Sequence, residues 1–317
     1  MDEMKGNSLA VFNSNDIYPV SADSELPFEQ HRDIFHLTGI DQEETILIVY
    51  PASKNHKTRE ILFIRKSDNH TKVWEGEKLS KKQANELSGI NNICYIEDFK
   101  DVLSSIATEV DTFYINKNEH YRANSPVETR EDRFISWLLK KYPAHNVAKS
   151  NPILQRQRSI KHPYEIDQIK RACEITEKGF NRVLKFIKPN IWEYEIEAEF
   201  IHEFINNSSK GFAYSPIIAS GNDNNVLHYI KNNKQCKSGE LILMDVGAEY
   251  GNYSSDMTRT VPVSGKFSKR QKQVYNAVLR VKNEATKLLT VGNNWKLFHE
   301  QVGEIMTKEL LDIGLID

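Results

Sequence analysis

Short apolar runs alternate with longer amphipathic stretches over the first 142 residues of the chain. Apolar runs rich in β-branched side chains predict strands at residues 45–50, 61–64 and 112–115. Apolar positions at helical spacing predict helices at residues 80–87, 106–109 and 128–142. Strands that alternate with helices are typical of an α/β domain.

The stretch at residues 143–158 interrupts this alternation. It begins at Pro143, contains Pro152 and has weak periodicity, so we interpret it as a linker. The sequence therefore predicts two domains, one at residues 1–155 and the other at residues 156–317.

Helical patterns open the second domain. A helix is predicted to begin at Pro163 and to end before Pro189, because proline is favoured at the first helical position and disfavoured further along. Its expected buried stripe comprises Ile166, Ile169, Ala172, Cys173, Ile175 and Thr176. Residues 191–207 alternate glutamate with apolar residues and fit a strand as well as a helix, and we favour the helix because the run is long.

Strand patterns follow, and two more helices end the sequence. The strand patterns are at residues 215–220, 226–230, 240–250 and 252–263, and the helices at residues 269–289 and 295–313.

Two aspartates interrupt the strand patterns near their centre. Asp245 closes the apolar run at residues 241–244, and Asp256 follows a Gly-Asn pair that suits a two-residue hairpin turn. Counting back from that turn places Asp245 opposite Thr258 and puts both acids on one face, as diagonal neighbours roughly 7–8 Å apart.

Two carboxylates this close need a cation between them, or one must bind a proton. Carboxylates suit hard divalent ions, so the pattern indicates a metal site. The alternative is a hairpin on the surface with solvated acids, and a β-bulge would shift the register and remove the argument. His228, on the strand predicted at residues 226–230, is either a packed core residue or a proton carrier near neutral pH.

Composition narrows the classes of function. The net charge is −2 and the sequence pI is about 6.6, so neither nucleic acid nor an anionic membrane is expected as a partner. No secretory signal and no apolar run of about 18 residues is found, and three separated cysteines favour a reducing cytoplasm. Phosphate-binding, dinucleotide-binding and nucleophile-elbow motifs are missing, and neither His-Glu pair completes a zinc helix.

The sequence resembles the family of aminopeptidase P, prolidase, methionine aminopeptidase and creatinase. The resemblance rests on AYSPIIASGNDNNVLHY, on LILMDVGAEYGNYSSDMTRTVPVSGKF and, upstream, on FEQHRDIFHLTGIDQEETILIV and LFIRKSDNHTKVWEGEKL. It covers about residue 8 to the end of the sequence. It implies an α/β N-terminal domain of the creatinase and prolidase type, followed by the α+β "pita-bread" catalytic domain.

This resemblance also implies a function and a site. The function is metal-dependent release of the N-terminal residue from peptides with proline second, by water activated at two divalent ions, commonly Mn²⁺. Asp245 and Asp256 match metal ligands, and His228 matches a histidine that assists at the scissile bond. The Thr258 hydroxyl, which the predicted register places beside Asp245, can reach that carboxylate and is expected to support it. Trp74 matches an aromatic residue near the substrate pocket of a neighbouring subunit, which implies a homo-oligomer, either a dimer or a tetramer.

The family pattern continues with one histidine and two glutamate ligands beyond the helix expected to end near residue 311, whereas the sequence ends at Asp317. We therefore expect about the first half of the catalytic domain, with weak metal binding and no cleavage of X–Pro peptides by residues 1–317 alone. Three alternatives stay open: a prolidase-type dipeptidase, a metal-free creatinase-like hydrolase, and a non-enzymatic pita-bread binding protein. The two aspartates argue against the metal-free hydrolase.

Overall fold

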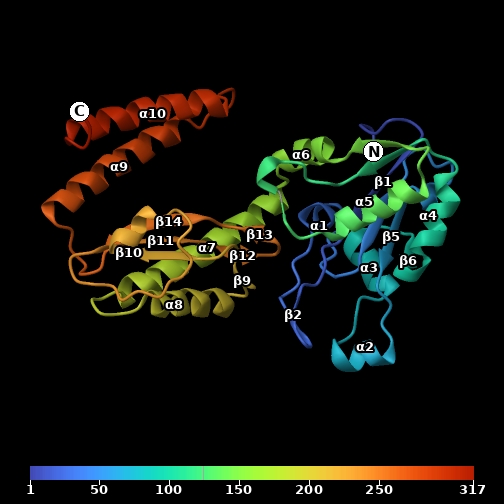
Figure 1. Ribbon diagram of the computed structural model, residues 1–317, viewed down its shortest axis with the longest axis horizontal. Coiled ribbons are helices and arrows are strands. Elements are labelled where there is room, and N and C mark those ends of the chain that lie inside the picture. The colour runs from blue at the N-terminus through green and yellow to red at the C-terminus, as the bar shows by residue number, and fades with distance from the viewer. Residues whose placement is uncertain (124) are drawn as a thin grey trace. The chain divides into compact units, whose positions relative to one another are not determined.

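The computed structural model describes residues 1–123 and 125–317, which form two compact units, Met1–His162 and Pro163–Asp317 (Figure 1). The sequence predicts a boundary after residue 155, and the division in the structure comes after His162. Residues 143–158 are not a linker, because they contribute strand β8 (Asn146–Lys149) and helix α6 (Asn151–Ser159) to the first unit. Tertiary pairing with a neighbouring strand overrides their weak periodicity.

A six-stranded mixed sheet forms the centre of the first unit, in the order β6-β5-β4-β1-β7-β8. Its remaining strands are β1 (Ser8–Asn13), β4 (Ile46–Val49), β5 (Glu60–Ile64), β6 (Ile93–Tyr95) and β7 (Thr112–Ile115). The pairs β5–β6, β1–β7 and β7–β8 are parallel, whereas β1–β4 and β4–β5 are antiparallel. A separate small hairpin joins β2 (Pro19–Ser21) to β3 (Ser24–Glu25). The predicted α/β class is confirmed.

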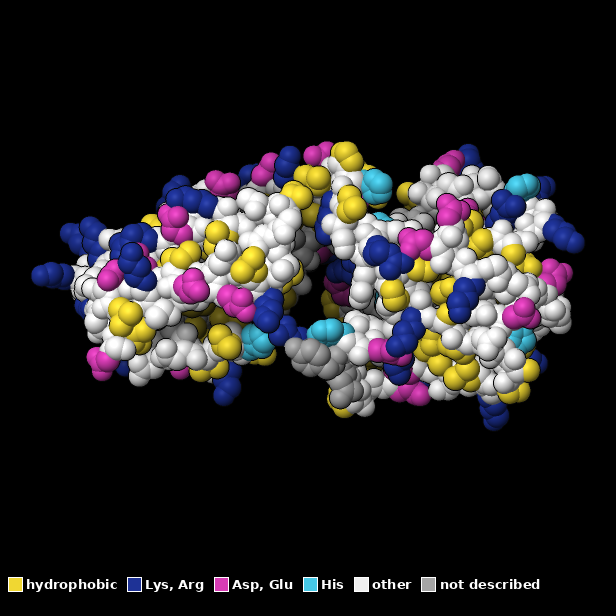
Figure 2. Space-filling model, turned by 90° about the horizontal axis from the view of Figure 1, so that it is seen from above, with side chains coloured by type: hydrophobic (Ala, Val, Ile, Leu, Met, Phe, Trp, Pro, Cys, Tyr) yellow, Lys and Arg dark blue, Asp and Glu magenta, His cyan; other side chains and the backbone are white. Residues whose placement is uncertain are grey.

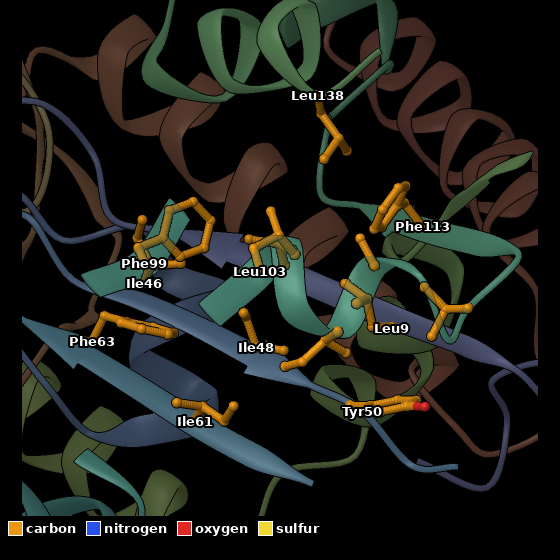
Figure 3. Close-up of a cluster of buried hydrophobic side chains, with 14 of the residues drawn as sticks. Leu9, Ile46, Ile48, Tyr50, Ile61, Phe63, Phe99, Leu103, Phe113 and Leu138 are labelled. Atoms are coloured by element: carbon orange, nitrogen blue, oxygen red, sulfur yellow. The ribbon is translucent and has the colours of Figure 1, made fainter. Parts of the chain in front are cut away.

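Helices cover both faces of this sheet. On one face lie α4 (Phe99–Ala107) and α5 (Arg130–Lys141), and on the other lie α1 (Arg32–Thr38), α3 (Lys81–Ser88) and α6. Figure 3 shows the first of these cores, where Phe99, Leu103 and Leu138 meet side chains from the strands. The helix predicted at residues 106–109 in fact begins at Phe99. Short elements complete the unit: α2 (Asn69–Trp74) and three 3₁₀ turns, His56–Thr58, Ile96–Asp98 and Tyr121–Ala123.

The second unit packs two helices against one face of antiparallel strands (Figure 1). The helices are α7 (Pro163–Phe186) and α8 (Glu193–Asn206), and the helical interpretation of residues 191–207 is confirmed. One sheet has the order β10-β11-β14, from β10 (Ile217–Ser220), β11 (Leu241–Val246) and β14 (Met257–Pro262). The other has the order β13-β12-β9, from β9 (Gly211–Phe212), β12 (Ala248–Tyr250) and β13 (Tyr253–Ser254).

The buried face of α7 differs in part from the predicted stripe. Ala172, Ile175 and Thr176 are fully buried, but Ile166 and Cys173 are exposed. The buried face continues instead through Gly179, where a Cβ atom would lie 2.8 Å from a ring carbon of Phe204 on α8. Phe180 and Val183 are buried on the same face.

Two helices end the second unit as predicted. They are α9 (Lys269–Leu288) and α10 (Trp295–Asp312). The Arg280 guanidinium of α9 donates to both carboxylate oxygens of Glu309 on α10, at 2.8 and 2.6 Å. On the face shown in Figure 2, lysine and arginine side chains are interspersed with aspartate and glutamate. No helix within the described ranges is both long enough and apolar enough to span a membrane.

Candidate metal centre

A tight hairpin carries the two aspartates. Gly251 and Asn252 form its two-residue turn, with φ angles of +57° and +67°. Positive φ at both central positions is the mark of a type I′ turn, whose twist matches that of the strands. Tyr250 faces Tyr253 across the turn, so the predicted turn is confirmed.

The pairing register stays constant from this turn to the base of the hairpin. Glu249 pairs with Ser254 near the turn, and further along the same hairpin Asp245 pairs with Thr258. The register is unchanged between these two pairs, so the predicted register is confirmed and no bulge separates Asp245 from Asp256. The two acids therefore point to the same face of the hairpin.

The hairpin strands come unusually close at Gly247, between the two acids. A Cβ atom on Gly247 would lie 1.8 Å from the backbone oxygen of Ser255, so only glycine fits there. Thr176 of α7 contacts both strands beside Gly247. Its hydroxyl accepts from Ala248 N at 2.8 Å and lies 2.7 Å from the Ser255 hydroxyl. Ala248 N also donates to the Ser255 hydroxyl at 3.0 Å. These contacts fix the distance between the two strands where the acids leave them.

Tyr214 joins the two carboxylates directly. Its hydroxyl oxygen lies 2.6 Å from Oδ1 of Asp245 and 3.2 Å from Oδ1 of Asp256, so both carboxylates contact the same hydroxyl group. Sequence reasoning missed this residue, although it stands three positions before Ile217, which pairs with Asp245 in the adjacent strand. The available signal was its position: Tyr214 directly precedes the strand predicted at residues 215–220, which lies beside the strand that carries Asp245.

The electrostatics of this cluster keep the phenol protonated. Burial raises the pKa of Tyr214 well above its ordinary value, and the hydrogen bond to Asp245 and the charge of Asp256 raise it further. Tyr214 is therefore a donor to the carboxylates. The acids themselves are less enclosed than the sequence suggests, because Asp245 is half-buried and Asp256 is exposed.

Thr258 lies opposite Asp245 in the ladder, as predicted, and is exposed. The hydroxyl that the structure places on Asp245 is that of Tyr214. A supporting role for Thr258 therefore stays a prediction.

His228 lies in a turn rather than on a strand, so the strand predicted at residues 226–230 is wrong. The asparagine-rich segment before it forms a 3₁₀ helix, Gly221–Asn225, and Asn224 bonds to the backbone of Leu241 and Leu243. These side-chain contacts replace strand pairing. His228 is exposed, which excludes the alternative of a packed core histidine.

Trp74 belongs to the first unit, at the end of α2. Its side chain is 74% exposed and stacks on His70, with ring centroids 6.0 Å apart. A large exposed aromatic side chain is available for contact with another molecule. Its expected place beside a neighbouring subunit's pocket stays a prediction.

The Asp245–Asp256 pair fits part of a divalent metal centre. Oxygen ligands suit hard divalent ions, and two carboxylates converging on one phenol offer up to four such oxygens. Each such ion prefers about six ligands. Within residues 1–123 and 125–317, no group of three or more His, Cys, Asp or Glu side chains is arranged to hold a metal ion.

Comparison with known proteins assigns a family to both units. The model of metallopeptidase family M24 matches residues 167–315, and the model of the aminopeptidase P N-terminal domain matches residues 1–114. An Xaa-Pro aminopeptidase of Haemophilus influenzae is 30% identical over 99% of the chain and 70% of its own length. The chain belongs to metallopeptidase family M24.

Within this family the chain is similar to the aminopeptidase P group. The Xaa-Pro aminopeptidase of Escherichia coli is 28% identical over all of the chain and 72% of its own length. A zinc-substituted E. coli aminopeptidase P, solved in complex with product, superposes with a TM-score of 0.88 at 28% identity, over 100% of this chain and 72% of that one. These findings confirm the predicted family and both predicted fold types, and they identify the chain as an M24 metal-dependent aminopeptidase.

Proposed function

We propose that this protein releases the N-terminal residue from peptides whose second residue is proline. The observation that carries the proposal is the hydrogen-bonded Asp245–Tyr214–Asp256 cluster, which lies within the region matched by the M24 family model. Relatives that cover the whole chain are Xaa-Pro aminopeptidases, which supports the same specificity here.

Asp245 and Asp256 are the residues that would hold the metal, which we propose to be two Mn²⁺ ions. When bound, divalent metal supplies activation of the attacking water and polarisation of the scissile carbonyl. The single Tyr214 hydroxyl lies within hydrogen-bond distance of both carboxylates, with the shorter contact to Asp245, and so sets the direction in which their remaining oxygens point. The Gly247–Ser255 crossing, held by Thr176, fixes the spacing of the two backbones that carry them.

His228 is proposed as the substrate-side residue. An exposed imidazole at the tip of a turn is free to meet a peptide, and histidine donates or accepts a proton near neutral pH. In this role it would hydrogen-bond the peptide at the scissile bond. Thr258 would support Asp245 from the opposite strand.

The remaining expectations concern partners and place. A peptide is the proposed substrate, and the protein is proposed to act in the cytoplasm as a homo-oligomer, either a dimer or a tetramer. Exposed Trp74 would then reach the substrate pocket of a neighbouring subunit. Size-exclusion chromatography with light scattering tests the oligomer, and Trp74→Ala should raise KM if the residue reaches a partner's pocket.

The specificity is tested with two matched tripeptides that differ only in having proline or alanine second. With Mn²⁺ the protein should cleave the proline peptide at least tenfold faster than the alanine peptide, and a chelator should abolish cleavage. Equal cleavage of both peptides, or cleavage that resists chelation, would refute the proposal.

A further inference from the structure

The loop that carries His228 leaves the sheet at Ser220 and returns beside the start of α8. Its return arm is anchored there by a bridge between Trp192 and Gln235. The first residue of α8 is Glu193, whose side chain is fully buried, with 0% of its surface exposed. Burying a carboxylate costs free energy unless hydrogen-bond donors surround it. The donors that contact Glu193 therefore indicate its structural role.

Glu193 accepts four hydrogen bonds, two on each carboxylate oxygen. Oε1 accepts from the backbone N of Ser220 at 2.8 Å and from the Ser220 hydroxyl at 2.7 Å. Oε2 accepts from the Tyr229 hydroxyl at 2.7 Å and from the backbone N of Lys234 at 3.0 Å. Ser220 begins the loop, Lys234 ends it and Tyr229 is the residue next to His228. One side chain therefore holds both arms of the loop and the neighbour of its tip.

Asn232 reinforces the returning arm. Its amide nitrogen donates to Glu197 at 2.8 Å and to the backbone oxygen of Pro216 at 3.0 Å, and its oxygen accepts from Ile218 N at 3.0 Å. Lys234 also donates to the backbone oxygen of Ser220 at 3.1 Å. The base of the loop is thus ordered by side chains, while His228 at its tip is left exposed.

We propose that Glu193 is a positioning residue for His228. It fixes the loop through Ser220, Tyr229 and Lys234, so that the imidazole meets the peptide in one orientation without rearrangement of the loop. This inference rests on the proposed role of His228. Preorganisation of this kind matters because a small displacement of a catalytic group lowers the rate steeply.

The carboxylate is specifically required by the pattern of donors. A backbone N–H points at each of its two oxygens, whereas a glutamine side chain offers one acceptor and one donor. In Glu193→Gln one backbone N–H must face an NH₂ group, whichever way the amide is turned. The variant therefore keeps the shape of the side chain and releases one arm of the loop.

Glu195→Gln is the matched control. Glu195 lies in the same first turn of α8, so the substitution changes the same charge near the same helix end. Among the described residues its Oε2 accepts one side-chain hydrogen bond, from Trp192 N at 2.6 Å, and a glutamine oxygen can replace that acceptor. It does not contact the His228 loop through any hydrogen bond of the described residues.

Two measurements test the proposal. Amide hydrogen exchange at Ser220 or Lys234 should be at least tenfold faster in Glu193→Gln and unchanged in Glu195→Gln. With an X–Pro tripeptide, Glu193→Gln should lower kcat about tenfold with little change in KM. In a His228→Ala background the same substitution should cause no further loss, because a positioning residue has nothing left to position.

Unchanged exchange at both amides, or rate losses that multiply in the double variant, would overturn the proposal. If Glu193→Gln does not fold, Tyr229→Phe removes one hydrogen bond and leaves both backbone N–H donors bonded to the carboxylate, and it should give a smaller loss in kcat, about threefold. A normal rate in His228→Ala would instead refute the proposed role of His228, while the exchange experiment would still report on Glu193.

Discussion

Gly247→Ala is the substitution whose effect the structure defines most sharply. Gly247 lies on the hairpin between Asp245 and Asp256, and an added Cβ atom would lie 1.8 Å from the backbone oxygen of Ser255 and 2.6 Å from its carbonyl carbon. The same atom would lie 3.2 Å from the ring of Tyr214. The nearest obstruction is backbone, so no side-chain rotation relieves the clash.

The magnitude follows from the contacts that must move. Restoring a tolerable separation of about 3 Å requires the strands to part by roughly 1 Å. That displacement breaks the bonds from Ala248 N to the hydroxyls of Thr176 and Ser255, at 2.8 and 3.0 Å. Each of the two lost bonds costs about 1 kcal/mol and overpacking about 1–3 kcal/mol, so we expect a loss of about 3–5 kcal/mol in local stability.

Amide hydrogen exchange measures this loss where it occurs. Ser255 N donates to Ala248 O at 3.0 Å, so its exchange reports opening of the crossing. Gly303→Ala on α10 is the control, because no atom lies within 4 Å of its added Cβ and alanine favours a helix. Gly247→Ala should also weaken Mn²⁺ binding measured by calorimetry, since it separates the two carboxylates. Protection at Ser255 within 0.5 kcal/mol of the unsubstituted protein would refute the reasoning.

Three further outcomes are expected. Asp256→Asn should weaken Mn²⁺ binding at least tenfold in calorimetry, and retained affinity would exclude it as a ligand. Tyr214→Phe should weaken binding about fivefold by removing the shared donor, a loss of about 1 kcal/mol, and unchanged affinity would contradict its orienting role. The hydrogen bond from Lys117 lowers the pKa of Asp132 to about 2, so its contribution to the stability of the first unit is present above pH 4 and lost as the pH falls towards 2. Asp132→Asn should flatten acid unfolding over that range, whereas Asp101→Asn, an exposed acid on α4, should not.

Sequence reasoning succeeded where local pattern decides the structure. The Gly251-Asn252 turn sets a register by itself, and the parity of side chains along a strand then places Asp245 opposite Thr258 without knowledge of the rest of the fold. Long amphipathic runs such as α9 were predicted for the same reason, since a helix of 20 residues repeats its pattern many times.

It failed where contacts from distant segments decide the structure. Residues 143–158 have weak periodicity, yet β8 pairs with β7 and Leu154 of α6 is buried in the core. The apolar letters of residues 226–230 suggested a strand, but Asn224 bonds to the neighbouring strand through its side chain and so leaves His228 in a turn. Neither contact has a signature in its own segment.

The same distinction explains which site residues the sequence hid. Asp245 and Asp256 are conspicuous because charged residues are rare in an apolar strand pattern. Tyr214 and Glu193 fit their own segments without conflict, the first before a strand and the second at an acidic helix start. Their roles come from partners 31 and 42 residues away for Tyr214, and between 27 and 41 residues away for Glu193. The acids can be predicted from the sequence, whereas the hydroxyl that orients them and the carboxylate that holds the histidine loop require the fold.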